Sequence, residues 1–153
     1  MDARFLLDTN ICIYIRRQRP TAVLERFQRL KPGEAVLSVI TYGELIYGVE
    51  KSQFREQATR QLAELAGLVP VMELPLQAAQ FYGAIRAGLE ARGEMIGNND
   101  LWIAAHAKAA GLTLVTNNES EFRRIQGLKI QNWVHRAAAA SIPLASTGAP
   151  VPA

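Results

Sequence analysis

The stretch Arg4–Asn10 reads RFLLDTN, and it decides which kind of fold the rest of the chain must form. Its three apolar residues, Phe5 to Leu7, are typical of a short strand that is buried on both faces of a parallel sheet. The strand stops at an acid, Asp8, and residues 11–17 then have the pattern of a helix. Asp8 can cap that helix, or it can belong to a site at the carboxyl end of the strand. Both interpretations are open at this point.

The alternation of strand and helix continues along the chain. Further strands are predicted at 35–40, 69–72, 112–115 and 128–130, and further helices at 21–30, 41–51, 54–66, 75–92, 98–110 and 119–125. Pro75 is expected in the first turn of its helix, where proline is tolerated. Strands that alternate with helices predict an α/β fold with a mostly parallel sheet.

Length and composition predict one domain. The chain has 153 residues, of which 49% are hydrophobic and 20% charged, and this is typical of a globular protein with a core of ordinary size. We place the domain at 1–136. The tail 137–153 is rich in Ala, Ser and Pro and carries no charge, so we expect it to be disordered.

The same totals bear on location and partners. No apolar run approaches the roughly 18 residues that a membrane-spanning helix needs, and the first residues lack the order of a signal peptide. The single cysteine, Cys12, excludes an internal disulfide and suits a cytoplasmic protein. A net charge of +3 fits a polyanionic partner but does not require one.

Four acids occupy equivalent places in the predicted fold. Asp8 follows the first strand, and Glu44 lies in the first turns of the helix after the second strand. Asp100 lies in the first turn of the helix that begins near Asn98, and Glu121 follows the strand 112–115. Because the carboxyl ends of parallel strands meet at one edge of the sheet, these acids can converge there.

Each acid alone also has a simpler interpretation. Asp8 and Asp100 can cap helices, Glu44 can complete a capping box with Thr41, and Glu121 can be an exposed helix charge. Together they favour a metal site, because clustered carboxylates repel one another and raise one another's pKa. With no His or Cys cluster, hard oxygen ligands indicate Mg²⁺ or Mn²⁺, and such an ion can assist phosphodiester cleavage.

Small polar residues accompany the acids. They are Thr9, Asn10, Thr116, Asn117 and Asn118. Their side chains can orient carboxylates, bind metal-bound water or touch a phosphate oxygen. Turn and cap chemistry is the alternative, above all for Asn10 and for the pair Asn98 and Asn99.

Several longer motifs now extend this pattern. LLDTN (6–10), SVITYGELIYGVEKS (38–52), IGNNDLWIAAHAKAAGLTLVTNNESEF (96–122) and GLKIQNW (127–133) follow one another in this order. From about Arg4 to Trp133 the chain resembles the PIN-domain ribonucleases, and among them the VapC toxins of type II toxin–antitoxin systems. The resemblance implies a three-layer α/β/α sandwich and an endoribonuclease that depends on Mg²⁺, for which Mn²⁺ can substitute.

The resemblance also implies roles for single residues. The first three acids of the family are matched by Asp8, Glu44 and Asp100. Many PIN domains have Asp where this chain has Asn118, so Glu121 would supply the remaining carboxylate here. Asp8 and Asp100 would hold the ion most directly, and we expect one well-held ion. Thr116 matches the family's hydroxyl residue near the metal.

Partners follow from the same resemblance. Family members cleave structured RNA, often a tRNA and sometimes ribosomal RNA, and thereby stop translation. A VapB-type antitoxin inserts a C-terminal segment into the groove beside the acids, and the toxins form homodimers in larger complexes that reach operator DNA through the antitoxin. No membrane partner is expected.

Two alternatives and two further residues complete the predictions. Asn118 motivates a PIN-fold binding module with weakened catalysis, and a nuclease of the same fold with another nucleic-acid substrate is also open. Arg86 lies among apolar residues in the middle of its predicted helix, so we expect it to contact RNA or a partner. His106 is expected to be a packed structural residue.

Overall fold

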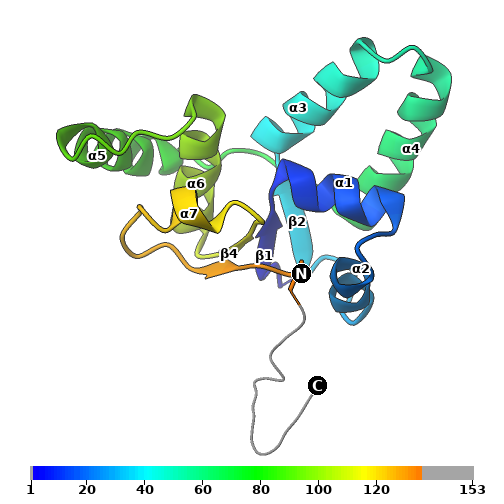
Figure 1. Ribbon diagram of the computed structural model, residues 1–153, viewed down its shortest axis with the longest axis horizontal. Helices are drawn as coiled ribbons and strands as arrows, with labels where there is room; N and C mark the ends of the chain where they lie inside the picture. The colour runs from blue at the N-terminus through cyan, green and yellow to red at the C-terminus, as the bar shows by residue number, and fades with distance from the viewer. Residues whose placement is uncertain (1, 136–153) are drawn as a thin grey trace, which may run out of the picture.

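A single parallel sheet forms the centre of the protein. The computed structural model describes residues 2–135, and its five strands are all parallel in the order β3-β2-β1-β4-β5 (Figure 1). The strands are β1 (Phe5–Leu7), β2 (Ala35–Ser38), β3 (Val71–Met72), β4 (Thr113–Val115) and β5 (Ile130–Gln131). The prediction of a mostly parallel sheet is confirmed.

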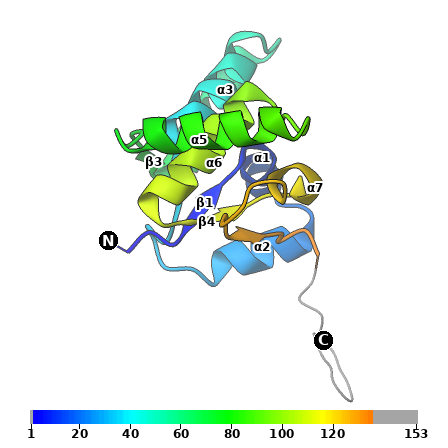
Figure 2. The same ribbon diagram turned by 90° about the vertical axis from the view of Figure 1, so that its left-hand side faces the viewer.

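Helices cover both faces of the sheet. They are α1 (Thr9–Arg17), α2 (Thr21–Gln28), α3 (Val39–Glu50), α4 (Arg55–Leu68), α5 (Ala78–Ala91), α6 (Asn98–Ala110) and α7 (Glu119–Phe122). Figure 1 shows α1 to α4 on one side of β1 and β2, and α5 to α7 on the other; Figure 2 shows the second group from the front. This is the predicted α/β/α sandwich.

The central strand β1 supplies side chains to both layers of the core. Phe5 and Leu7 belong to the apolar cluster beneath α1 to α4, whereas Leu6 belongs to the cluster beneath α5 to α7. All three are buried. Successive strand residues point to opposite faces, so an unbroken apolar run is what a doubly covered strand needs.

Several predicted boundaries were wrong, among them the end of the helix 119–125, which stops at Phe122, and two of the differences have a clear local cause. The second strand ends at Ser38, whose hydroxyl oxygen accepts a hydrogen bond from the Ile40 N–H (3.1 Å) and so caps α3. Thr41 is therefore not the N-cap but lies buried inside the helix. Helix α5 begins at Ala78, since Pro75 forms the preceding turn with its carbonyl bound to the Ala78 N–H (2.9 Å).

Two sequence predictions concern the ends of the chain and its relation to a membrane. The predicted tail 137–153 lies outside the described residues, as do the first and last residues of the predicted domain 1–136. Within residues 2–135, no helix has the length and apolar character that crossing a membrane requires.

Candidate functional site

Asp8 caps a helix and is also bound to a residue at the carboxyl end of the neighbouring strand. Its Oδ1 accepts a hydrogen bond from the Ile11 N–H (3.0 Å) and caps α1. Its Oδ2 accepts one from the Thr116 hydroxyl, which follows β4 at the neighbouring carboxyl end. Only 6% of Asp8 is exposed. One carboxylate is thus fixed from two sides, by a residue three positions away and by another 108 positions away.

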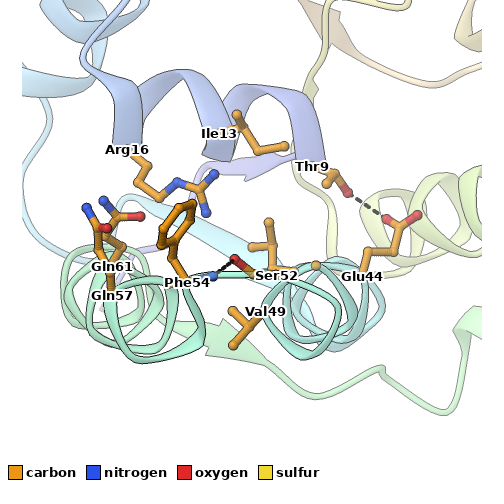
Figure 3. Close-up of a pocket in the computed structure, with 12 residues that line it drawn as sticks. Thr9, Ile13, Arg16, Glu44, Val49, Ser52, Phe54, Gln57 and Gln61 are labelled. Atoms are coloured by element: carbon orange, nitrogen blue, oxygen red, sulfur yellow. Dashed lines mark hydrogen bonds between the residues drawn. The ribbon is translucent and has the colours of Figure 1, made fainter.

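Glu44 joins three helices at the same edge. Its Oε1 accepts a hydrogen bond from the Thr9 hydroxyl (2.6 Å) at the start of α1, as Figure 3 shows. Its Oε2 accepts one from the side-chain amide of Asn99 (3.2 Å) at the start of α6. The capping box with Thr41 is excluded, because Ser38 caps this helix and the Glu44 carboxylate is bound elsewhere.

Asp100 lies near the other three acids. Burial raises the pKa of its carboxyl to about 6, and the charges of Glu121, Glu44 and Asp8 contribute in that order. Burial also raises the pKa of Asp8; the hydrogen bonds from Thr116 and the backbone oppose this shift, and the charge of Glu44 adds to it. The N-cap of α1 and three acids from α3, α6 and α7 therefore lie within electrostatic reach of one another.

No cation neutralises these four acids within residues 2–135. Every ion pair that the structure describes joins other residues: Arg4–Glu34, Arg55–Glu50, Arg86–Glu90, Arg92–Glu94 and Arg123–Glu119. Buried or half-buried carboxylates without a counter-ion are costly to gather, because each one disfavours the charge of the next. Their arrangement therefore fits a site that receives a cation from outside the chain.

The donor set fits Mg²⁺ or Mn²⁺. It consists of carboxylate oxygens, which these ions prefer. In the described part of the chain, no group of three or more His, Cys, Asp or Glu side chains is arranged to hold a metal ion as the side chains stand. Mg²⁺ keeps several waters and is commonly bound through one or two carboxylates, so a site of this kind would need no more than two direct carboxylate ligands.

The predicted polar neighbours divide into two groups. Thr9 and Thr116 each donate to an acid of the site. The Asn118 N–H donates to the Thr116 hydroxyl (2.9 Å), so Asn118 contributes through its backbone. The Asn117 side chain instead contacts Tyr14 (3.5 Å) and Asn132 (3.1 Å), away from the acids.

Sequence reasoning assigned Asn99 to turn chemistry and missed its contact with Glu44. The available signal was its position directly before Asp100, at a helix start.

Comparison with known proteins adds to this geometry. The PIN domain family matches residues 5–128. Ribonuclease VapC2 of Haemophilus influenzae is 40% identical over 131 residues, which cover 86% of this chain and 98% of the relative. The tRNA(fMet)-specific endonuclease VapC of Shigella flexneri is 42% identical over 130 residues, covering 85% and 98%. The chain belongs to the VapC family of PIN-domain ribonucleases.

A solved structure agrees with this assignment. The crystal structure of DNA-bound VapBC from Salmonella typhimurium contains a chain that is 40% identical, with a TM-score of 0.80. The match covers 86% of this chain and 98% of that one. The family predicted from the sequence motifs is therefore confirmed, and so is its fold.

A groove leads away from the acids in this VapC-family chain. A cavity of about 310 Å³ lies between α1, α3 and α4 and begins at Thr9 and Glu44 (Figure 3). Ile13, Val49 and Phe54 give it apolar walls, and Arg16 with two glutamines lines its outer part. The cavity therefore offers an extended segment both apolar and polar contacts next to the site.

Arg86 and His106 lie outside the group of acids. Arg86 is exposed on α5, where it donates to the Tyr82 hydroxyl (2.9 Å) and pairs with Glu90 (3.2 Å). Its contact with RNA or a partner stays a prediction. His106 is fully buried, and its Nδ1 hydrogen-bonds the Ser38 hydroxyl (2.9 Å). Burial lowers its pKa, as befits a neutral structural histidine.

Proposed function

We propose that this VapC-family chain is the toxin of a toxin–antitoxin system and a Mg²⁺-dependent endoribonuclease. It acts in the cytoplasm on structured RNA, with tRNA as the first candidate, and inhibits translation. The observation that carries the proposal is the convergence of Asp8, Glu44, Asp100 and Glu121 without a neutralising cation among the described residues. The Shigella flexneri relative named as tRNA(fMet)-specific supports the choice of substrate.

Each acid has a part in the proposed mechanism. A bound Mg²⁺ would supply a water of lowered pKa and offset charge on the attacked phosphate. Asp8 and Asp100 would hold the ion. The hydroxyl of Thr116 fixes the orientation of Asp8, and Thr9 with Asn99 fixes that of Glu44. Glu44 and Glu121 would orient the attacking water. Its oxygen would bond to phosphorus as the bond from phosphorus to the 3′-oxygen breaks, and protonation of that leaving oxygen gives 5′-phosphate and 3′-hydroxyl ends.

The proposed partners follow the VapBC complexes that resemble this chain. We propose that a VapB-type antitoxin inserts a segment into the groove between α1, α3 and α4, because this cavity opens beside Glu44. A segment seated there blocks access of RNA to the acids. The chain forms a homodimer within the larger complex, and operator DNA is contacted through the antitoxin. The DNA-bound VapBC structure from Salmonella typhimurium supports the antitoxin partner and the contact with DNA.

Cleavage by the wild type and by Asp8→Asn tests the proposal. Both are incubated with tRNA, ribosomal RNA and single-stranded DNA, with Mg²⁺ or with EDTA. Asparagine keeps an oxygen that can accept the Ile11 N–H, so the cap of α1 is retained while one charge is lost. We expect the wild type to cleave tRNA only when Mg²⁺ is present. The variant should lose at least about 100-fold in cleavage rate, since mutation of residues that merely support metal ligands already lowers activity 10–100-fold.

Three results would contradict parts of the proposal. Full activity of Asp8→Asn excludes the metal mechanism. A wild type that binds tRNA but cleaves none of the three substrates favours the weakened binding module that Asn118 suggests. Cleavage of DNA in preference to both RNAs favours a nuclease of the same fold with another substrate.

A further inference from the structure

Two arginines connect the segments that carry Asp100 and Glu121. Arg124, just after α7, donates from Nη1 to the carbonyls of Met95 (3.0 Å) and Glu94 (3.3 Å) in the loop before α6. Arg92, at the end of α5, donates from Nη2 to the carbonyl of Arg124 (2.7 Å). Arg92 also pairs with Glu94 (2.9 Å). We call this set of bonds the arginine clasp.

The loop held by the clasp leads directly to an acid of the site. Residues 93–97 connect α5 to α6, and Asp100 lies in the first turn of α6. A Cβ placed on Gly97 would lie 3.7 Å from Asp100 Oδ2, so the end of the loop borders the carboxylate itself. A displacement of the loop is therefore passed on to Asp100.

The other end of the clasp holds a helix that is too short to fix itself. Helix α7 comprises four residues, Glu119–Phe122, and its N-cap Asn118 makes no side-chain capping bond. A single turn has little stability of its own, because helix formation repays its nucleation only over several turns. The direction of Glu121 therefore depends on contacts outside α7, and Arg124 lies three residues beyond it.

Apolar contacts hold the same two segments together beneath the clasp. Ile96 from the loop, Phe122 from α7 and Ile125 after it are buried in one cluster. The burial of these side chains stabilises the fold independently of the arginines. Loss of the clasp is thus expected to loosen the arrangement of Asp100 and Glu121 without unfolding the protein.

We propose that Arg92 and Arg124 are positioning residues, which hold the loop 93–97 against the end of α7 and so set Asp100 and Glu121 relative to each other. The inference rests on the proposed function and deepens it. Arg124 donates hydrogen bonds to main-chain carbonyls of the loop 93–97, which indicates that it positions this loop. The competing explanation is that Arg124 only attracts RNA by its charge. Arg123 allows the two explanations to be distinguished. It is the neighbouring arginine, it is exposed, and it pairs with Glu119 rather than with the loop.

The experiment compares Arg124→Met, Arg124→Lys and Arg92→Met with the matched control Arg123→Met. For each purified protein, Mn²⁺ affinity is measured by calorimetry, kcat and KM are measured on tRNA, and the melting temperature is recorded. Arg124→Met and Arg123→Met remove the same charge from adjacent positions, so charge loss cancels in their comparison. Arg92→Met breaks the clasp from its other side, in case Arg124→Met does not fold.

We expect Arg124→Met and Arg92→Met to bind Mn²⁺ about tenfold more weakly and to lose kcat by a similar factor, with little change in KM, as for residues that support metal ligands. Arg124→Lys keeps one donor group and should recover part of the affinity. Arg123→Met should stay within about twofold of the wild type.

The inference is overturned if Arg124→Met and Arg92→Met bind Mn²⁺ like the wild type, or if Arg123→Met loses affinity equally. Failure of the proposed function is seen in the wild type itself: a wild type that neither binds Mn²⁺ nor cleaves RNA rejects the function and the inference with it. A wild type that does both, beside unaffected clasp variants, rejects the inference alone.

Discussion

The two sides of helix α7 differ in how their glutamates are paired. Glu119 pairs with Arg123 (2.6 Å) and accepts a further hydrogen bond from Asn132 (2.8 Å). Glu121, two residues later and on the other side of the turn, has no cation partner among the described ion pairs, and its charge raises the pKa of Asp100. The same short helix therefore carries one neutralised carboxylate and one that adds to a cluster of acids.

The difference shows that the cluster does not result from a shortage of basic residues. Lys and Arg outnumber Asp and Glu by 17 to 14 in this chain, and arginines pair with acids elsewhere on its surface. Such exposed pairs contribute little to stability. An acid that is left without a cation, half-buried and beside three others, is better explained by a role that needs its free oxygens.

The strongest test of this comparison removes the negative charge of one glutamate at a time, first on one side of α7 and then on the other. Glu121→Gln should weaken Mn²⁺ binding about tenfold, because an uncompensated carboxylate of the site is lost. Glu119→Gln, the matched control two residues away, should change the affinity by less than about twofold. Titration of both variants with Mn²⁺ measures the effect. Equal affinities in the two variants would remove Glu121 from the site.

A second test measures how much the clustered negative charge lowers the stability of the metal-free protein. The carboxyl of Asp100 has a pKa of about 6 in the fold, against 3.8 for the unperturbed group. Between these values the folded state binds more protons than the unfolded state, so metal-free stability falls as pH rises from about 4 to about 6. Asp100→Asn removes this penalty and should raise the melting temperature at about pH 8 by roughly 3–5 °C.

The control for this test is to repeat the comparison of Asp100→Asn with the wild type at a lower pH. At about pH 4 the wild-type carboxyl is largely protonated, so the advantage of Asp100→Asn should shrink. Excess Mn²⁺ should also reverse the order, because the ion stabilises the protein that binds it. A variant that melts below the wild type at about pH 8 without metal would show that Asp100 is compensated by contacts other than a metal.

The smallest expected effect concerns an unpaired polar atom outside the group of acids. The hydroxyl of Thr41 is buried in α3, and no hydrogen-bond partner for it is found in the described structure. Thr41→Val should stabilise the protein by about 1 kcal/mol, because a desolvated hydroxyl without a partner is removed. Denaturant unfolding measures the change, and Thr41→Ser, which keeps the hydroxyl, should not stabilise. Mn²⁺ affinity should be unchanged in both.

Local patterns predicted the mostly parallel α/β sheet and a possible convergence of acids, whereas the three layers were implied by the resemblance to the PIN-domain ribonucleases. The run Phe5 to Leu7 is a strand that is buried on both faces, as its unbroken apolar character indicates. Parallel strands then bring their carboxyl ends to one edge, so the strand pattern places Asp8 there and allows Glu44 to approach it. Asp100 follows a helix and a loop, so the strand pattern allows its convergence but does not require it.

The contacts that orient the acids could not be predicted in this way. The bond from Thr116 to Asp8 spans 108 positions, and that from Asn99 to Glu44 spans 55. No local periodicity contains such pairs. The sequence pattern predicted Thr41 as the cap of α3, because Ser38 fits equally well as the last residue of the strand. Only the position at which the helix begins shows that Ser38 is the cap. The arginine clasp joins backbone carbonyls, which leave no mark in the sequence.

The double use of Asp8 has a consequence for how such a chain can be silenced. One of its oxygens ends the first strand by capping α1, and an asparagine side chain can make the same bond. Aspartate and asparagine codons differ by a single base. Under the function proposed above, a host cell that escapes the toxin through Asp8→Asn would keep the cap of α1 and with it a folded chain that can still bind the antitoxin, so the variant would not present an unfolded product to cellular proteases.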